Sequence, residues 1–323
     1  MTVGWYVHHH GAGHVQRFGA VAPHLRDVVA LSSARLPGVE LPLDTTDRPR
    51  DPTAGGALHW APLGHAGLRE RMARISAWIA ANEPCAFVVD VSVEVAALAR
   101  LHGVPTVVVA QRGRRDDPPH RLAYTSATTV AAPWTAATHL AGDGLPDARV
   151  QFTGAISRFD GRAPGAPERG VVLLVAGAGG HALDAADVVA AARATPDWEW
   201  HVAGALRVGA PVVDHGADAD VWPLLQRAEV VVGTAGGNVV AEVAAARRPF
   251  VCVPQDRPFA EQQRQADALD RAGLADVHRA WPEAAAWPGV LAAARERDPA
   301  RWEVLHDGRG AQRLAALVAE VAR

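Results

Sequence analysis

Lysine is absent from this sequence: all 32 positively charged side chains are arginines. Without lysine the chain cannot form the lysine Schiff base on which ordinary pyridoxal-phosphate enzymes depend. It also cannot contain a Walker A loop, because the Gly-Lys-Ser/Thr step of that loop uses lysine to contact nucleotide phosphates. Two large classes of enzyme are therefore excluded.

Cysteine is almost absent as well. Cys85 and Cys252 lie far apart, each beside an apolar run, and their spacing fits neither a zinc ribbon nor a redox pair. We expect both to be buried core thiols. The net charge is only −3, so nothing in the overall balance indicates nucleic acid as a partner.

Long apolar runs are missing too. No stretch approaches the length that spans a bilayer, and residues 1–10 lack the basic and apolar segments of a signal peptide. Both observations lead us to expect a cytoplasmic protein.

Histidine is plentiful near the start of the chain. His8, His9 and His10 suggest a metal site, and His10 and His14 are at helical spacing. Successive side chains leave a strand on opposite faces, however, so His9 points away from His8 and His10, and no Asp, Glu or Cys nearby completes a set of ligands. We therefore expect no metal.

The chain contains enough hydrophobic sequence for two globular domains. Of its 323 residues 49% are hydrophobic and 21% charged, the balance of a folded globular protein. Short β-rich runs alternate with Ala/Leu/Arg stretches of helical period, which indicates βαβ units and parallel sheets. The runs expected to be strands are 4–7, 87–91, 106–109, 171–175, 198–202, 229–232 and 250–253, with helices at 14–25 and 94–101 among them.

A break in this alternation divides the chain. Residues 157–170 contain Pro164, Pro167 and three glycines with mixed charges, a composition typical of a linker. We therefore predict an α/β protein with two Rossmann-like doubly wound domains facing across a cleft, residues 1–156 and 157–323. The last helix could return to pack on the N-terminal domain. Ligands of such sheets bind beyond the carboxyl ends of the strands, so the loops after the strands are the candidate sites.

The strongest functional signal is the run from Gly233 to Glu242, which follows an apolar strand and opens an Ala-rich helix. Glycines at such a turn let the backbone approach a phosphate, with unpaired N–H groups and the helix dipole directed at it. Glu242 lies one helical turn past Asn238, on the same face, where it could accept hydrogen bonds from ribose hydroxyls. The alternative is a tight turn with a solvated glutamate.

Two further loops follow strands. Gly177-Ala178-Gly179-Gly180-His181 could likewise supply backbone donors to a phosphate, although alone such a loop is weak evidence. The loop at 254–263 is rich in Gln, Asp and Glu, whose donors and acceptors suit the recognition of sugar hydroxyls. A polar loop entering a surface helix is the plainer interpretation of that second segment.

Residues 233–242, 248–250 and 254–263 together resemble the C-terminal domain of family 28 glycosyltransferases, which include the lipid-linked N-acetylglucosaminyltransferases of peptidoglycan synthesis. The resemblance implies a GT-B fold, in which the N-terminal domain binds the acceptor and the C-terminal domain binds a nucleotide-sugar donor. It implies transfer of a hexosyl-type sugar from a UDP-linked donor to an acceptor hydroxyl, with no metal and no further cofactor.

The skeleton of Gly236, Asn238 and Glu242 is also similar to the signature of UDP-glycosyltransferases that modify small molecules. That signature commonly begins with His, where this sequence has Thr234, a departure that weakens the transfer of that position's role. The resemblance implies that Glu242 binds ribose and that residues 219–224 lie along the nucleobase. It also implies that Gly236 and Gly237 contact the diphosphate and that Glu261, Gln262 and Gln263 contact the donor sugar. The remaining donor-binding candidates are Gly177, Gly179, Gly180, Thr234 and Asn238.

His14 is the candidate catalytic residue. Residues 10–15 resemble the glycine-rich first loop of the same group, where a Gly-His pair opens the first helix facing the cleft. The positive end of a helix dipole disfavours an imidazolium, which favours a neutral ring able to accept a proton. That suits a general base for an acceptor hydroxyl. A helix-capping or substrate-orienting histidine is the equal alternative.

Two segments of the N-terminal half could contact the acceptor. Residues 111–117 carry Arg112, Arg114 and Arg115 after a strand, where they could bind a phosphate or carboxylate, although a solvated loop is the commoner explanation. Residues 68–79 (Leu68 to Ile79) form a basic amphipathic helix, which in the resembled lipid-linked enzymes approaches the inner membrane surface. Such a helix more often packs on its own sheet, so peripheral membrane contact is the alternative.

Two other functions compete with sugar transfer. Enzymes of the same fold epimerise or hydrolyse nucleotide sugars, which would require further carboxylates, with Asp90 and Glu94 as candidates. A non-catalytic partner subunit could instead bind nucleotide sugar for another protein. Thr234 favours that interpretation, whereas Glu242 and His14 argue against it.

Overall fold

The computed structural model describes residues 2–176 and 183–323, and the chain forms two compact units. Unit 1 consists of residues 1–133, 141–154 and 309–323, and unit 2 of residues 134–140 and 155–308. The chain therefore passes between the units at four points, one of them two residues before the boundary predicted after residue 156.

Unit 1 is built on a seven-stranded sheet in the order β3-β2-β1-β4-β5-β6-β7, in which all neighbours run parallel. The strands are β1 (Val3–Val7), β2 (Val28–Ser32), β3 (Gly38–Glu40), β4 (Ala86–Asp90), β5 (Thr106–Val109), β6 (Thr129–Ala132) and β7 (Val150–Phe152). β1 and β4 are buried along their whole length, which is typical of parallel strands with both faces covered.

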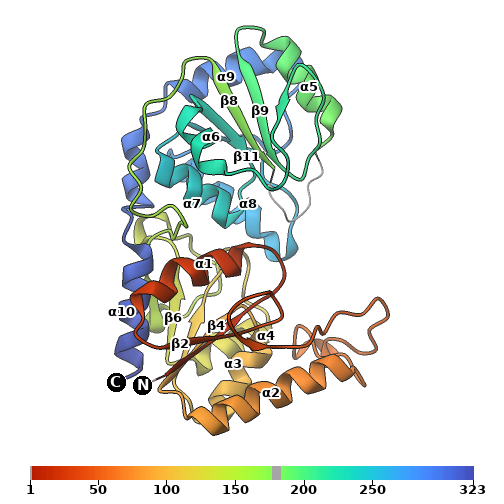
Figure 1. Ribbon diagram of the computed structural model, residues 1–323, viewed down its shortest axis with the longest axis vertical. Coiled ribbons are helices and arrows are strands. Elements are labelled where there is room, and N and C mark those ends of the chain that lie inside the picture. Colours follow the sequence, from red (N-terminus) through yellow and green to blue (C-terminus); the bar gives the residue numbers. More distant parts are fainter. Residues whose placement is uncertain (1, 177–182) are drawn as a thin grey trace. The chain divides into compact units, whose positions relative to one another are not determined.

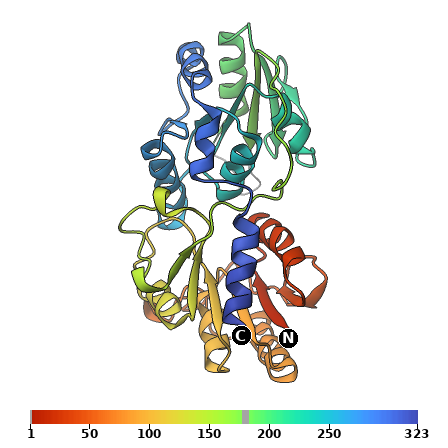
Figure 2. The ribbon, with the colours of Figure 1, turned by 90° about the vertical axis from the view of Figure 1, so that its left-hand side faces the viewer.

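Helices cover this sheet. They are α1 (Gly13–Val21), α2 (Ala66–Asn82), α3 (Val93–Leu101), α4 (Pro118–Ser126) and α10 (Gly310–Val321), with 3₁₀ turns η1 (Ala22–His24), η2 (Ala54–Gly56) and η4 (Asp147–Arg149). Ser92 caps α3 and Asp117 caps α4 by accepting backbone N–H groups of the first turn. α10, from the C-terminal end of the chain, packs beside α1 (Figures 1 and 2).

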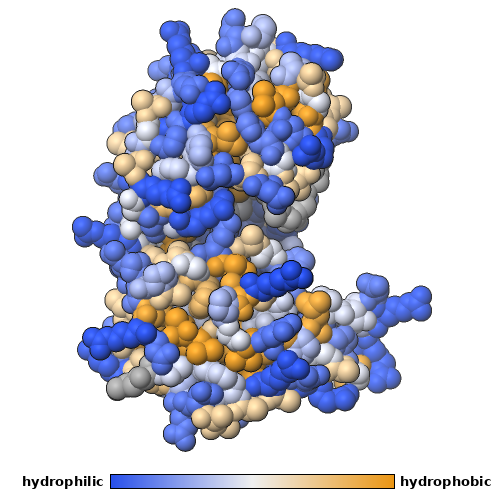
Figure 3. Space-filling view, viewed as in Figure 1, coloured by the Kyte–Doolittle hydropathy of each residue, from blue (hydrophilic) through white to orange (hydrophobic). Residues whose placement is uncertain are grey.

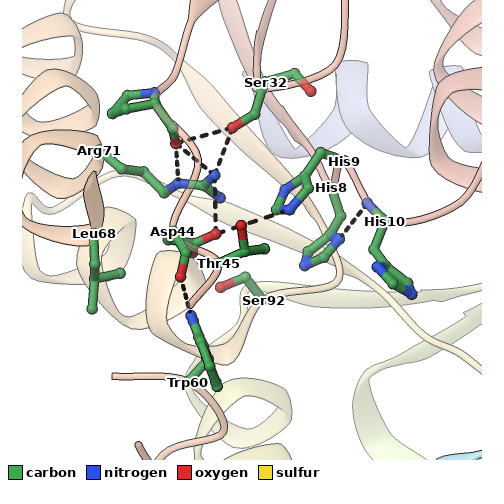
Figure 4. A network of polar contacts seen from close by, with 12 residues as sticks. His8, His9, His10, Ser32, Asp44, Thr45, Trp60, Leu68, Arg71 and Ser92 are labelled. Atoms are coloured by element: carbon green, nitrogen blue, oxygen red, sulfur yellow. Dashed lines mark hydrogen bonds and ion pairs between the residues drawn. The ribbon is translucent and has the colours of Figure 1, made fainter. Parts of the chain in front are cut away.

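A buried arginine fixes α2 to the sheet. The side chain of Arg71 is 1% exposed, donates to the Tyr6 hydroxyl at 2.7 Å and the Pro42 carbonyl at 2.8 Å, and pairs with Asp44 at 3.2 Å (Figure 4). Because each of the three guanidinium nitrogens donates to one of these groups or to Ser33, and Asp44 is ionisable, the charge is compensated inside the protein. Burial raises the pKa of Tyr6 to about 12, so its hydroxyl stays protonated.

The apolar face of α2 largely packs against the interior of unit 1. Ile75 and Ile79 are buried there, so they are not available to a lipid surface. Among the described residues, none of the helices has the length and apolar character that crossing a membrane requires. On the face drawn in Figure 3, hydrophobic residues gather in separate patches among hydrophilic ones. Peripheral membrane contact stays a prediction.

Unit 2 contains a six-stranded parallel sheet in the order β10-β9-β8-β11-β12-β13. Its strands are β8 (Val171–Ala176), β9 (Glu199–Gly204), β10 (Val213–Asp214), β11 (Val230–Gly233), β12 (Phe250–Cys252) and β13 (Asp276–Val277). Its helices are α5 (Ala185–Ala194), α6 (Val221–Arg227), α7 (Gly237–Ala246), α8 (Glu261–Arg271) and α9 (Trp287–Arg295), with 3₁₀ turns η3 (Ala136–Thr138), η5 (Pro258–Ala260), η6 (Ala284–Ala286) and η7 (Pro299–Val304). Trp200 and Trp287 meet edge to face at 5.1 Å in the core that α9 covers.

The two cysteines differ in burial. Cys252 is buried in β12, and burial raises the pKa of its thiol to about 12. Cys85 is only half-buried, because it lies just before the first residue of β4. Its thiol there lies 3.3 Å from the Thr2 carbonyl oxygen. The expectation of two buried thiols is therefore correct only for Cys252.

Each sheet reverses its strand order at one place, between β1 and β4 in unit 1 and between β8 and β11 in unit 2. In doubly wound sheets ligands bind at such a switch point, beyond the carboxyl ends of the two strands. The register puts Val7 beside Asp90 in unit 1 and Val175 beside Gly233 in unit 2. The loops that follow these four positions are therefore the candidate sites.

Candidate active site

The switch point of unit 1 brings His14 and Asp90 together. His14 is the second residue of α1, which follows β1, and Asp90 is the last residue of β4. Their side chains meet at 2.9 Å, from Nδ1 of the imidazole to Oδ1 of the carboxylate. The predicted base therefore has a carboxylate partner, a group that the sequence alone suggests only for the rival activities.

Asp90 is fully buried and ionised. Burial by itself raises the pKa of its carboxyl group, but Arg17, 2.6 Å away, and His14 outweigh that effect and hold the pKa below its usual value. Because the folded pKa is lowered, the stability that ionised Asp90 contributes is complete above about pH 4 and is lost only as the pH falls through that lowered value. The carboxylate is therefore charged at physiological pH.

This pairing determines which nitrogen of His14 is basic. An ionised carboxylate can only accept hydrogen bonds, so Nδ1 of His14 carries the proton and donates it to Asp90. Nε2 is then the nitrogen with the lone pair. When that nitrogen accepts a proton, the adjacent carboxylate stabilises the imidazolium. The arrangement can therefore act as a general base.

Backbone strain accompanies Asp90. Val91, the next residue, has φ of +65°, a left-handed conformation that is a genuine outlier for a β-branched residue. Such a conformation costs on the order of 1–3 kcal/mol and persists only where the surrounding structure enforces it. Here it turns the chain sharply from β4 into Ser92, the cap of α3.

In unit 2 the loop after β11 opens α7, as predicted. Gly236 is the N-cap residue, Gly237 is the exposed first residue of the helix, and Asn238 follows it half-buried. Thr234 accepts the backbone N–H of Gly236 at 3.3 Å, so it shapes the turn. Gly177, Gly179 and Gly180 lie outside the described residues. Their roles stay predictions.

Glu242 is buried in α7 and faces Arg158. Nε of Arg158 donates to Oε1 of Glu242 at 2.8 Å, and the arginine side chain is 38% exposed. Burial raises the pKa of Glu242, and the arginine offsets only part of that increase. Further hydrogen-bond donors to this carboxylate would stabilise its ionised form.

Arg158 also connects Glu242 to the segment expected along the nucleobase. Its guanidinium lies 4.7 Å from the centre of the Phe159 ring, and Phe159 packs at 4.8 Å against Trp222 of α6. Residues 158 and 159 belong to the segment that the sequence analysis treated as a linker. The signal that could have found them is an Arg-Phe pair in an otherwise small and polar stretch.

The third predicted segment lies next to the glycine turn. A Cβ atom placed on Gly236 would lie 3.9 Å from Nε2 of Gln262, so α8 begins beside the start of α7. Oε1 of Gln262 accepts the N–H of Gln255 at 2.9 Å. Nε2 of Gln263 donates to Asp256 at 2.6 Å, while its buried Oε1 has no hydrogen-bond partner among the described residues. Glu261 is the half-buried first residue of α8.

The arginines of residues 111–117 are mostly not solvated, contrary to the explanation that the sequence favours. Arg112 and Arg115 are buried; Arg112 pairs with Asp143 at 3.8 Å, and Arg115 donates twice to the Arg112 carbonyl. Arg114 is the exposed member. The Arg115 guanidinium therefore holds its own loop, and the Arg112 guanidinium pairs that loop with a segment further along the chain.

One cluster in the described part of the chain has metal-ligand spacing. Candidate ligand atoms of His59, Asp117 and His120 lie within 4.8 Å of one another. An N–H of Arg115 lies 3.3 Å from Nε2 of His120, which leaves Nδ1 of that ring to donate to Asp117 at 2.7 Å. Burial and then Arg115 lower the pKa of His120 to about 4. With both ring nitrogens engaged and a guanidinium adjacent, the cluster suits a hydrogen-bonded anchor better than a cation.

Glu94 holds the long loop at 41–65. Its Oε1 accepts the backbone N–H groups of His59 at 2.7 Å and Trp60 at 2.9 Å, while Oε2 accepts the hydroxyl of Ser92 at 3.0 Å. Of the two carboxylates considered for an epimerase or hydrolase, Asp90 is therefore engaged by His14 and Glu94 by this loop.

We expect Glu94→Ala to lower the free energy of unfolding by about 1–3 kcal/mol, because two partly buried N–H groups lose their acceptor. Glu94→Gln keeps one acceptor oxygen and should lose less than half as much. Urea denaturation measures both. Glu70→Ala, which removes an exposed carboxylate from α2, is the control and should change stability by less than about 0.5 kcal/mol. A Glu94→Ala loss no larger than this control would contradict the anchoring role.

Two doubly wound parallel sheets in one chain define the class of fold. No protein-family model matches the chain, and no curated protein matches its sequence. Solved structures do match it. The glycosyltransferase of kitacinnamycin has a TM-score of 0.67 and 17% identity, over 99% of this chain and 98% of its own.

MurG of Acinetobacter baumannii has a TM-score of 0.59 and 15% identity, covering 99% of both chains. UGT89C1 of Arabidopsis thaliana complexed with UDP-L-rhamnose has a TM-score of 0.69 and 12% identity, over 100% of this chain and 99% of its own. The chain therefore has the GT-B fold of these glycosyltransferases, as its sequence predicts. At these identities the likeness concerns the fold.

Proposed function

We propose that this protein is a glycosyltransferase that transfers a sugar from a UDP-linked donor to the hydroxyl group of an acceptor. The observation that carries the proposal is the contact of His14 with the buried, ionised Asp90 at the switch point of unit 1. A histidine oriented by a carboxylate is suited to deprotonating a hydroxyl group.

In the proposed reaction Nε2 of His14 accepts the proton of the acceptor hydroxyl. The acceptor oxygen then forms a bond to the anomeric carbon, while the bond from that carbon to the donor diphosphate breaks and the diphosphate keeps the electron pair. Direct displacement of this kind inverts the anomeric centre. Asp90 stabilises the imidazolium, and backbone N–H groups at the start of α7 would stabilise the departing diphosphate without a metal.

The donor proposal is supported by unit 2. Glu242, in the helix that the Gly236 turn opens, has a carboxylate whose pKa is raised by burial, and ribose hydroxyls are suitable donors to it. UGT89C1, which shares the fold, is known in complexes with UDP and with UDP-L-rhamnose. The same protein is known with quercetin, so a planar, hydroxylated compound is a reasonable first acceptor to test.

The rival activities are less well supported. An epimerase or hydrolase requires carboxylates available to the substrate, whereas Asp90 is bonded to His14 and Arg17, and Glu94 to the loop at 41–65. A non-catalytic subunit would have no use for the His14–Asp90 pair.

We expect UDP and UDP-sugars to raise the melting temperature. At one hundred times its dissociation constant, a ligand of the folded state adds about 2.7 kcal/mol, which corresponds to a shift of roughly 5–10 °C for a domain of this size. Differential scanning fluorimetry with uridine, guanosine and thymidine nucleotides and NAD measures it. An equal response to NAD would indicate a redox enzyme and contradict the proposal.

Turnover is tested by mass spectrometry of quercetin incubated with several UDP-sugars. A product heavier by one sugar residue supports the proposal. Release of free sugar at the same rate without any acceptor would indicate a hydrolase, and stabilisation by UDP-sugar without turnover on a broad panel of hydroxylated acceptors would indicate a binding subunit.

A further inference from the structure

The turn between β1 and α1 determines where His14 lies relative to Asp90. The side chain of His8 closes this turn with a hydrogen bond. Nδ1 of His8 accepts the backbone N–H of His10 at 3.0 Å, immediately after the end of β1. Gly11 follows with φ of +80°, and Ala12, the N-cap residue of α1, makes no capping bond through its side chain. The hydrogen bond from His8 is therefore a specific constraint on a short turn in which neither Gly11 nor Ala12 contributes a side-chain hydrogen bond.

The hydrogen bond requires His8 to be neutral. Nδ1 can accept only while it has a lone pair, and a protonated ring would direct its own N–H at the N–H of His10. Burial, and then the neighbouring charges of His14 and His9, lower the pKa of His8 to about 3. The ring is therefore an uncharged acceptor throughout the physiological range, with its proton on Nε2.

The ring of His8 is itself held on several sides. It stacks on His9 at 4.9 Å with an interplanar angle of 9°, meets Tyr6 edge-on at 6.2 Å, and lies 5.6 Å from the ring of His14. His9 in turn lies 3.9 Å from Asp44, the partner of buried Arg71. Figure 4 shows His8, His9 and His10 beside this network. The turn is thus tied to the interior of unit 1 and not only to its own backbone.

We propose that His8 is a positioning residue for the transfer reaction, which closes the turn after β1 and so fixes Nε2 of His14 where it can accept the acceptor proton. The inference rests on the proposed function. His8 acts through His14 and needs no contact with the substrate. Its specific requirement is a neutral acceptor atom two residues before the N–H of His10.

Substitutions at position 8 can separate the need for a hydrogen-bond acceptor from the effects of side-chain volume and polarity. Asn at position 8 can accept the N–H two residues ahead, as asparagine does in Asx turns. Gln has the same amide group, but one methylene further from the backbone, so its oxygen cannot form the same hydrogen-bonded turn with the N–H of His10. Leu fills a similar volume with no acceptor. The three variants therefore differ in the one property that the proposal invokes.

We expect His8→Leu and His8→Gln to lower kcat about thirty- to a hundredfold with the KM for the donor unchanged, because a displacement near 1 Å of a catalytic group costs about a hundredfold. His8→Asn should stay within about threefold of the wild type. His24→Leu, an exposed histidine in the 3₁₀ turn after α1, is the matched control and should leave kcat unchanged. Each variant is compared at a temperature well below its own melting temperature.

A spectroscopic measurement tests the same inference without turnover. The Nδ1 proton of His14, donated to a buried carboxylate, should give a strongly deshielded proton NMR signal, lost in His14→Ala. We expect that signal in the wild type and in His8→Asn, and its loss or broadening in His8→Gln. If His8→Gln keeps both the signal and wild-type kcat, the positioning role is overturned, as it is if His8→Asn behaves like His8→Leu. If the wild-type protein transfers no sugar, the proposed function fails, and the NMR comparison still decides whether His8 positions His14.

Discussion

Asp90→Asn should reduce kcat about a thousandfold while the stabilisation by UDP stays that of the wild type. The imidazolium that forms on His14 would lie beside a neutral amide and the positive charge of Arg17, instead of beside a carboxylate at 2.9 Å. Two unit charges about 4 Å apart attract by roughly 4 kcal/mol at an effective dielectric constant near 20, which corresponds to about a thousandfold in rate. Steady-state kinetics and donor titration measure the two effects separately.

The substitution also removes the partner of Arg17, so a loss of about 1–3 kcal/mol in the free energy of unfolding is expected. Kinetics are therefore measured where the variant is fully folded, as shown by its circular dichroism. Asp27→Asn, at an exposed carboxylate of the same unit, is the control and should change neither rate nor binding. His14→Ala should match the loss of Asp90→Asn or exceed it. Turnover of Asp90→Asn within tenfold of the wild type would remove the carboxylate from the mechanism.

The parts of the fold that could be predicted are those with a strong local signal. Residues 4–7, 87–89 and 171–175 are continuous apolar runs, because their strands are buried on both faces, and the structure has β1, β4 and β8 there. β3, β10 and β13 have only two or three residues each, too few to produce an alternation or an apolar run. They are edge strands of the two sheets, where pairing with a neighbouring strand defines the strand more than its own composition does.

The site was predictable only where one loop contains the whole signal. The turn before α7 and Glu242 follow from a single ten-residue motif, and the structure puts them on one helix. The contacts of His14 with Asp90 and of Arg158 with Glu242 join residues 76 and 84 positions apart. They depend on which strands are neighbours and on the path of the connecting segment, neither of which a local pattern specifies. Asp90 was therefore noticed as a carboxylate but not as the partner of His14.

Glu242→Gln should weaken binding of UDP and UDP-sugars about ten- to a hundredfold while leaving the stability of the unliganded protein unchanged or slightly higher. Hydrogen bonds to a charged acceptor contribute about 1.5–3 kcal/mol, and the amide offers one acceptor oxygen without the charge. In the unliganded protein the ionised carboxylate is unfavourable, because burial raises its pKa despite Arg158. Its removal therefore eliminates an internal penalty, while Arg158 remains partly hydrated.

The same pKa predicts how donor binding depends on pH. A carboxyl group whose folded pKa is raised destabilises the folded state by its full amount above that folded pKa, and the penalty decreases below it and is gone below the usual pKa of 4.5. A donor that hydrogen-bonds the ionised form lowers the pKa again. Affinity for UDP should therefore be highest well above the usual pKa of 4.5 and fall as Glu242 becomes protonated, whereas Glu242→Gln should lack this component. Isothermal titration calorimetry between pH 5 and pH 8 measures both.

Glu168→Gln supplies the control, because Glu168 is an exposed carboxylate of unit 2 that also pairs with an arginine, Arg227. It should bind UDP with wild-type affinity and wild-type pH dependence. A Glu242→Gln variant that binds as tightly as this control would show that the ribose contacts something else. A variant that loses stability but not affinity would make the pair of Glu242 and Arg158 a structural one, and the donor would then have to be held by the Gly236 turn and the residues of α8 alone.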